Sequence, residues 1–348
     1  MTGKTLGFEN IHLYKEEIYA FEAAGITSEW DSSAICLGLM MREVWQNDPT
    51  KSVPRKLNPA HSTSKPLQLK DWRDFLYRLE TIPTEAGTPR QRATILLKKN
   101  LSKTQREWIA DLMGGAYEVK DSLTHRVFQE LVLGSHTFQQ TYGLSPWFNC
   151  KGYLKSHDRP LLSPKQVKAL KRWLGKKKRA AIFTNRPSRP PDDMFGTPEA
   201  EIGAKVAGLN HLPIVGLGDM IWLSAKKEQD VHDFLKPSPV HILTSLLQAK
   251  GISKKKALNS AANLVYKNLI DKVWQEFHGA KIYVFEDTTT GMKSALAAKE
   301  LLCENDIQIK LTLVGIATAK EKQESLFGLG AQVYPDLGQA LTSLFNFL

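Results

Sequence analysis

Two polar segments of the sequence stand where an apolar run ends, and one suits a phosphate group whereas the other suits a metal ion. One apolar run ends in Thr184 and Asn185, and a hydroxyl beside free backbone N–H groups suits a phosphate oxygen. A second run ends in Glu286 and Asp287, and adjacent carboxylates suit Mg²⁺, which prefers oxygen ligands. Each segment also has an ordinary structural interpretation, because a threonine or a carboxylate after a strand commonly forms a turn or caps the next helix.

A lysine lies between these segments, in the sequence Lys236-Pro237-Ser238-Pro239. The prolines fix the local backbone, and the lysine could neutralise a phosphate or a carboxylate pair. By itself this segment favours a surface loop. The order of hydroxyl, lysine and acidic pair, with 52 residues from 184 to 236 and 51 from 236 to 287, is far more specific than any one segment.

Together the three segments resemble the motifs of the haloacid dehalogenase superfamily of phosphohydrolases, in the subgroup with a helical cap. FTNRPS at 183–188 resembles the second motif, KPSP at 236–239 the third, and VFEDTTTGMKSA at 284–295 the fourth, which matches best. Members similar to phosphoglycolate phosphatase and phosphoglucomutase are the nearest by pattern. The resemblance covers about residues 150–340 and implies that 1–150 is the cap inserted between the first and second motifs.

The resemblance also implies a role for each matching residue. Thr184 would bind the transferring phosphoryl group with Asn185 beside it, and Lys236 would hold the charge of nucleophile and phosphate. Asp287 would ligate Mg²⁺, and Glu286 would ligate or support the ion. Thr184 and Lys236 would then be the catalytic residues present, and the substrate would be a small phosphorylated metabolite.

The first motif of the family is missing from the sequence. It is a strand ending in Asp-x-Asp whose first Asp is the nucleophile; residues 1–60 contain only Asp31 and Asp48, and neither follows an apolar strand. The family places this strand between those of the second and fourth motifs, so its loss would leave buried backbone groups unpaired. We favour a strand that lies upstream of Met1 or has diverged; Thr5–Leu13 is a poor replacement, and a degenerate remnant is the other explanation.

The elements that would position these residues differ between two parts of the chain. Residues 1–150 show helical periodicity and almost no strand pattern, which predicts an α-helical cap-like domain. Residues 151–348 alternate short apolar strands with helices, which predicts an α/β fold with a Rossmann-like parallel sheet core and helices on both faces. Such sheets bind ligands at the carboxyl ends of their strands.

The boundaries of the elements follow from apolar periodicity and capping residues. Asp31 or Ser32 is expected to cap the second helix, and Thr104 with Glu107 has the spacing of a capping box. The predicted strands are 180–183, 213–217 or 213–223, 281–285, 310–316 and 332–334. Residues 9–47 are predicted to be helical with a break at Gly25, and the other predicted helices are 69–79, 104–113, 121–133, 163–174, 240–250, 292–302 and 337–347.

Composition limits the class of protein. Hydrophobic residues make up 42% and charged residues 24% of the 348 residues, which is typical of a globular protein. No apolar run approaches the ~18 residues that a membrane span needs, and the N-terminus has no apolar signal segment. The three cysteines are far apart and fit neither a disulfide framework nor a zinc site. We therefore expect a cytoplasmic protein with no membrane partner.

Three functions are compatible with these motifs and with the net charge of +11. The first is a phosphohydrolase that lacks its nucleophile strand and is inactive as it stands, and the second is a non-catalytic relative that binds a phosphorylated ligand or a protein. The weakest is a basic nucleic-acid-binding protein, because Lys165–Arg179 contains eight basic residues and no acidic one. We interpret this run, like Lys254–Lys256, as a solvated surface, since no nucleic-acid recognition motif accompanies it.

Overall fold

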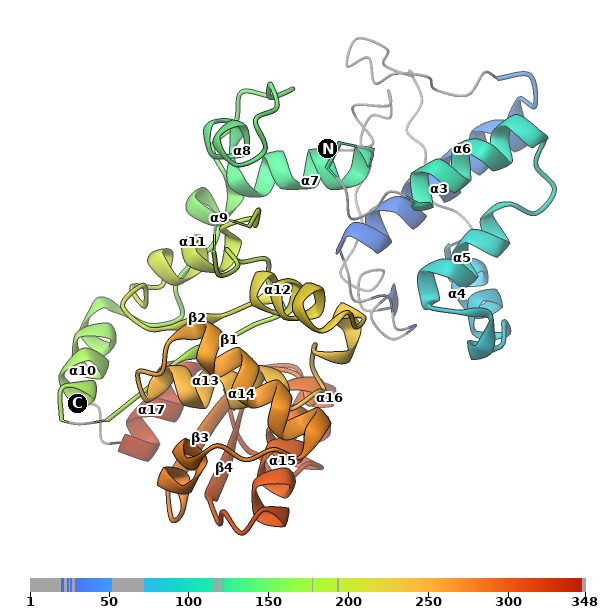
Figure 1. The fold of residues 1–348 in the computed structure, drawn as a ribbon. Helices are drawn as coiled ribbons and strands as arrows, with labels where there is room; N and C mark the ends of the chain where they lie inside the picture. Colours follow the sequence, from blue (N-terminus) through green and yellow to red (C-terminus); the bar gives the residue numbers. More distant parts are fainter. Residues whose placement is uncertain are drawn as a thin grey trace. The chain divides into compact units, whose positions relative to one another are not determined.

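The computed structural model divides the chain into two compact units, Met1–Gly152 and Tyr153–Leu348 (Figure 1). It describes Ala20, Phe21, Ala24, Ile26 and residues 29–51, 72–114, 119–120, 122–176, 178–192 and 194–345. The sequence predicted a boundary between 150 and 151. The segment Thr5–Leu13, most of the predicted helix 9–24 and most of the loop between 48 and 66 lie outside the described residues.

Among its described residues, the first unit contains helices and turns and no strand. Its core is formed mainly by α3, α5 and α6, which bury Ile35, Leu97 and Ile109 completely. The rings of Trp45 and Trp108 meet edge to face beside this core, with centroids 5.6 Å apart. The helices are α3 (Glu29–Asn47), α4 (Trp72–Glu80), α5 (Pro89–Leu97), α6 (Lys103–Gly114), α7 (Leu123–Leu133) and α8 (Ser135–Tyr142), with a 3-10 turn at Thr84–Ala86.

Two of the predicted helix caps in this unit are wrong. Helix α3 begins at Glu29, so Asp31 lies inside the helix, where it pairs with Arg90 at 3.5 Å instead of capping. At the start of α6 the reciprocal bonds join Ser102 and Gln105: the Ser102 N–H donates to Oε1 of Gln105 at 2.9 Å. The spacing of a capping box is therefore present, but it begins two residues before Thr104.

The second unit alternates helices with short strands. Among the described helices of the whole chain, none combines the length and the apolar character that crossing a membrane requires. The elements are α9 (Tyr153–Ser156), α10 (Pro164–Leu174), β1 (Ile182–Phe183), α11 (Glu199–Val206), β2 (Ile214–Val215), α12 (Leu217–Lys227), α13 (Val240–Ala249), α14 (Lys254–Lys267), β3 (Lys281–Glu286), α15 (Thr289–Glu304), β4 (Lys310–Ile316), α16 (Lys320–Phe327), β5 (Gln332–Tyr334) and α17 (Leu337–Phe345), with 3-10 turns at Val231–Asp233 and Lys272–Phe277.

The described strands form two small parallel sheets, β1-β2 and β3-β4-β5, where the sequence predicted one. The chain is thus a mixed α/β protein in which helices predominate. In the register, Ile182 pairs with Ile214 and Glu286 with Gly315. The first two strands are shorter than predicted, and the alternative strand 213–223 is wrong because α12 begins at Leu217.

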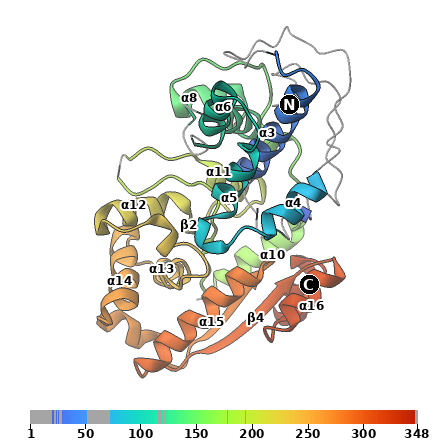
Figure 2. The same cartoon turned by 90° about the vertical axis from the view of Figure 1, so that its right-hand side faces the viewer.

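Helices cover both faces of the sheet β3-β4-β5. On one face α15 packs along β3 and β4, as Figure 2 shows, and Val284 joins the large apolar core there with Ala295. On the other face α17 brings the Phe345 ring to 4.9 Å from the ring of Tyr283. Helix α10 joins this second layer, since the ring of Trp173 lies 4.7 Å from that of Phe345. The predicted covering of a parallel sheet on both faces is confirmed for these three strands.

The edges of β1 and β3 remain without a strand partner in the part of the chain that the structure describes. Strand β1 pairs only with β2, and β3 pairs only with β4. The two sheets share one helical layer, because α13 packs on β1 and β2 and also on α15. Phe183 of β1 and Ile282 of β3 pack against the same apolar core. The strands β1 and β3 therefore belong to one folded unit, although no described strand joins them by backbone hydrogen bonds.

Helix α13 buries a titratable side chain in this shared layer. His241 is completely buried, and burial, reinforced by the charge of Lys236, lowers its pKa from 6.5 to about 3. The folded protein therefore holds His241 neutral, whereas the unfolded chain protonates it below its ordinary pKa. Because the folded-state pKa is the lower one, its contribution to stability is present above pH 6.5 and is lost as pH falls toward about 3.

We expect the free energy of unfolding to fall by about 1.4 kcal/mol through His241 when the pH is lowered from 7.5 to 5.5, because the imidazole takes up a proton only in the unfolded chain. Urea denaturation of the wild type and of His241→Leu at both pH values measures this contribution. The variant should lose less free energy of unfolding over that interval by the same amount. Identical pH dependence in the two proteins would contradict the assignment.

Candidate functional site

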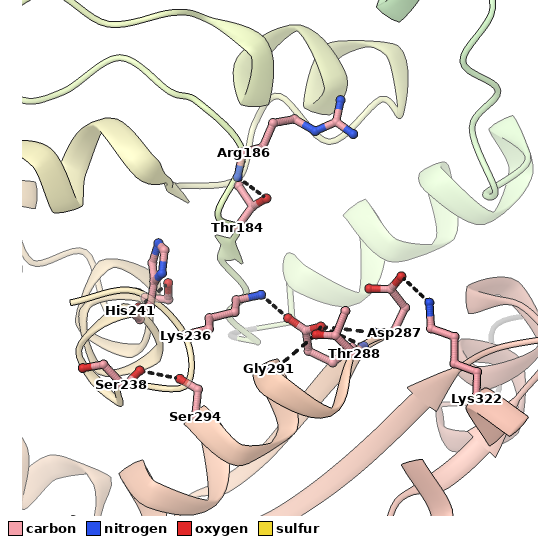
Figure 3. A network of polar contacts seen from close by, with 12 residues as sticks. Thr184, Arg186, Lys236, Ser238, His241, Asp287, Thr288, Gly291, Ser294 and Lys322 are labelled. Carbon is pink, nitrogen blue, oxygen red and sulfur yellow. Dashed lines mark hydrogen bonds and ion pairs between the residues drawn. The ribbon is translucent and has the colours of Figure 1, made fainter. Parts of the chain in front are cut away.

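A buried ion pair joins two of the predicted site residues. Lys236 contacts Oε1 of Glu286 through its Nζ, and the two side chains are only 10% and 6% exposed (Figure 3). Lys236 stands in the loop before α13, whereas Glu286 is the last residue of β3. The carboxyl end of a parallel strand has thus been brought against a loop 50 residues earlier in the chain. Burying either charge without the other would be costly.

The second oxygen of Glu286 organises the start of α15. Oε2 accepts hydrogen bonds from the backbone N–H of Asp287 at 3.2 Å and from the Thr288 hydroxyl at 2.9 Å. Thr288 is in turn the N-cap of α15, since its Oγ1 accepts from the Gly291 N–H at 3.2 Å. A Cβ at position 291 would lie 2.1 Å from Cδ of Glu286, so only glycine leaves room for this carboxylate.

Two further contacts hold Lys236 in place. The Ser294 hydroxyl of α15 donates to the backbone carbonyl of Ser238 at 2.7 Å, which ties the Lys236 loop to the helix after β3. Nζ of Lys236 also lies 4.2 Å from the ring centroid of Phe183, the last residue of β1. The lysine therefore contacts residues at the carboxyl ends of both β1 and β3.

Thr184 and Asn185 follow Phe183 directly, but no bond between either of them and the ion pair is found. The Thr184 backbone N–H donates to the carbonyl of Val215 at 2.9 Å, which extends the ladder to β2. Its Oγ1 accepts from the Arg186 N–H at 3.1 Å, and Asn185 is exposed. The Thr184 hydroxyl thus stabilises a turn, as a threonine after a strand often does, and it keeps its O–H free to donate to an anion.

Asp287 points away from Lys236 and toward α16, as Figure 3 shows. Its Oδ2 lies 3.0 Å from Nζ of Lys322, and the two side chains are 63% and 45% exposed. Among the residues that the structure describes, no three His, Cys, Asp or Glu side chains gather closely enough to hold a metal ion. Both carboxylates are engaged by lysines, and Asp287 is the more exposed of the two.

The structure therefore brings Lys236 and Glu286 into contact, places Asp287 beside them and leaves Thr184 linked to them through Phe183. Three contributors to the site were not predicted from the sequence: Lys322, Ser294 and Gly291, whose lack of a side chain leaves room for Glu286. Ser294 and Gly291 lie within the segment VFEDTTTGMKSA. No pattern in the sequence singles out Lys322, because its contact with Asp287 depends on how α16 packs.

Gly291→Ala should destabilise the protein by about 1–3 kcal/mol, because the new methyl group collides with the buried Glu286 carboxylate. The matched control is Gly203→Ala in α11, where a Cβ meets nothing within 4 Å. Urea denaturation of both variants measures the difference. The double variant Gly291→Ala/Glu286→Ala should be nearly as stable as the single variant Glu286→Ala, because the side chain with which the new methyl group collides is then absent. Equal losses in the single variants would show that the site tolerates a side chain at 291.

Lys236→Met should cost about 3–5 kcal/mol of unfolding free energy, because it leaves the Glu286 charge buried without its partner. Lys322→Met should cost no more than about 1 kcal/mol, because the ion pair with Asp287 is exposed and screened. Adding Glu286→Gln to Lys236→Met should recover much of the loss. Equal stabilities of Lys236→Met and Lys322→Met would contradict the burial of the first pair.

Comparison with known proteins gives a fold and no family. No family model matches the chain, and no curated protein matches it. One solved structure is similar, an X-ray structure determined by the Northeast Structural Genomics Consortium, with a TM-score of 0.60 and 17% sequence identity. The similarity covers 96% of this chain and 83% of that chain, so it includes elements of both units.

Proposed function

We propose that the carboxyl ends of β1 and β3 bind the phosphate group of a small phosphorylated metabolite. On this proposal the chain is a relative of the haloacid dehalogenase phosphohydrolases, and its α/β unit is a Rossmann-like core of that kind. One observation carries the proposal: the buried cation of Lys236 stands between Glu286 at the end of β3 and Phe183 at the end of β1. Ligands of open parallel sheets bind at such strand ends.

The electrostatics of the site support an anionic ligand. Lys236 and Glu286 together are close to neutral, so further positive potential must come from their surroundings. Helix α15 has 16 residues and begins at Thr289, and the partial positive charge of its N-terminus lies beside this pair. The Thr184 hydroxyl can add a donor from the β1 side. A phosphate would exchange water for this donor, and it would compete with Glu286 for Lys236.

The gap between β1 and β3 supports the resemblance independently of the side chains. The family places the strand of its first motif between those of the second and fourth motifs. Here these two strands are β1 and β3, and each lacks a described partner on one edge. A strand there would place its last residues beside Lys236, where the family has its nucleophile.

Turnover requires a nucleophile that the described residues of the site do not supply. Glu286 and Asp287 are engaged by Lys236 and Lys322. In the first unit, Asp31 pairs with Arg90, and Asp48 accepts from the Thr50 hydroxyl at 2.6 Å. Loss of the nucleophile from a covalent mechanism leaves only the rate due to binding and electrostatics, often several powers of ten lower. This favours binding without catalysis, the second of the three functions, for the chain as it stands.

Magnesium remains part of the proposal through Asp287. Mg²⁺ commonly uses one or two carboxylates, with phosphate oxygens and water completing its shell. Asp287 is exposed enough to supply one such oxygen, since its contact with Lys322 is a surface ion pair. The ion would add positive charge for a bound phosphate. Glu286 would support it from the side of Lys236.

We expect this chain to hydrolyse p-nitrophenyl phosphate in Mg²⁺ at no more than the rate of its Asp287→Ala variant. The reason is that neither the wild type nor Asp287→Ala holds a carboxylate in line with the phosphorus of the substrate. Robust turnover that Asp287→Ala abolishes would instead show that a carboxylate has taken the place of the nucleophile. A third sample, extended by the in-frame upstream coding sequence, tests whether an added Asp-x-Asp strand restores activity.

Binding is measured separately by titration calorimetry with inorganic phosphate. Thr184→Val should weaken phosphate binding about tenfold, the loss expected for one hydrogen bond to a charged group. Lys320→Met, an exposed lysine of α16, is the control for a general loss of charge. Equal affinities of Thr184→Val and wild type would remove Thr184 from the site, and no binding by the wild type would overturn the proposal.

A further inference from the structure

We propose that helix α10 and the turn after it bind the phosphate backbone of double-stranded nucleic acid without reading its sequence. This inference is independent of the phosphate site at β1 and β3. The surface, called here the α10 basic surface, is made of seven exposed side chains: Lys165, Lys168, Lys171, Arg172, Lys176, Lys178 and Arg179.

The excess positive charge of the chain is concentrated in the segment of the sequence that contains this surface. Residues 159–191 contain eleven basic residues and no Asp or Glu. Because the chain has 47 basic and 36 acidic residues, removing these eleven leaves 36 of each sign. The net charge of +11 is thus the charge of one segment, which is how a focused electrostatic surface differs from a generally basic protein.

The structure separates two lysine-rich runs that look alike in sequence. In the run at the start of α14, Lys254 pairs with Asp219 at 3.0 Å and Lys255 pairs with Asp192. By contrast, no residue of the α10 basic surface forms an ion pair with an acidic residue that the structure describes. Two of its side chains have only neutral partners, since Lys178 lies over the Trp173 ring and Arg179 donates to a backbone carbonyl.

A neighbouring histidine responds to the positive field of this surface. The turn after α11 packs on α10, where Gly208 approaches Val167. In the same turn His211 has a lowered pKa, first because of partial burial and second because of the charge of Lys171. The field of the surface therefore already acts on a nearby group, and an anion placed there would be attracted by it.

The position of α10 favours a ligand bound by charge alone. Lys165, Lys168 and Arg172 have the i, i+3, i+7 spacing of one helix face and span about 10 Å along the axis. The opposite face is fixed in the protein, because Leu170 packs on Leu341 in a buried cluster. A membrane-binding helix needs its apolar face free to enter the lipid, and α10 has already used its own.

A duplex suits this surface better than a single strand. Its phosphates lie at a spacing of ~1.7 Å along the axis, so a span of this length faces several of them. Single-strand binders add aromatic side chains on which bases stack. The one aromatic residue of α10, Trp173, is partly buried against Phe345 and is not a stacking platform. The phosphate backbone is therefore the only part of a nucleic acid that this surface is equipped to bind.

The test is fluorescence anisotropy with a labelled 20-base-pair duplex between 25 and 200 mM salt. It compares wild type, Lys165→Gln/Lys168→Gln/Arg172→Gln, and the matched control Lys267→Gln/Lys299→Gln/Lys320→Gln, which removes three exposed charges from other helices. We expect the first triple variant to bind at least tenfold more weakly at 50 mM salt. Its plot of log K against log salt should also be shallower by about 2–3, because three phosphate contacts are lost.

The control variant should match the wild type, and circular dichroism should show all three proteins folded. Equal weakening in both triple variants would overturn the proposal, since it would reduce the effect to net charge. Tighter binding to a single strand of the same length would contradict the duplex assignment. Binding to phosphatidylserine vesicles without binding to the duplex would assign the surface to membranes and overturn the proposal.

Discussion

The contact between Lys236 and Glu286 is the constraint on which the candidate site depends. A buried charge is tolerated only with a partner and further hydrogen bonds, and this pair meets that condition through residues of three elements. The Thr288 hydroxyl and the N–H of Asp287 donate to the Glu286 carboxylate. Ser294 holds the loop that carries Lys236, and Gly291 leaves room for the Glu286 side chain. The start of α15, the end of β3 and the loop before α13 are therefore positioned together.

This arrangement also links the ends of two strands that belong to different sheets. Lys236 contacts both Glu286 and the ring of Phe183, so the ends of β1 and β3 share one cation although no described strand joins them. The helices α13 and α15 keep these two strands in one apolar core. The protein thus holds Lys236 against the ends of both strands, while Glu286 and Asp287 at the end of β3 are engaged by lysines.

Long-range packing decides what each charged residue does, and the sequence alone cannot show it. Lys254–Lys256 and Lys165–Arg179 were given the same interpretation, yet among the residues that the structure describes only the first run meets acidic partners, which are Asp219 and Asp192. Likewise, Glu286 and Asp287 are adjacent in sequence but face different lysines, with 6% and 63% of their side chains exposed. Alternation along a strand sends neighbours to opposite sides, so adjacency does not imply a shared ligand.

The sequence by itself determined the local elements with strong apolar patterns: β4 and β5 have the predicted limits, and α10 begins after its Ser163 cap. It also placed Lys236, Glu286 and Asp287 beside the ends of α/β elements, because Glu286 and Asp287 follow an apolar run and Lys236 begins a Pro-rich turn. Only the tertiary structure decided that the strands form two sheets, that Glu286 pairs with Lys236, and that Lys322 reaches Asp287. The physical reason is that periodicity reports which face of an element is buried, whereas pairing depends on which distant residues fill the space against that face.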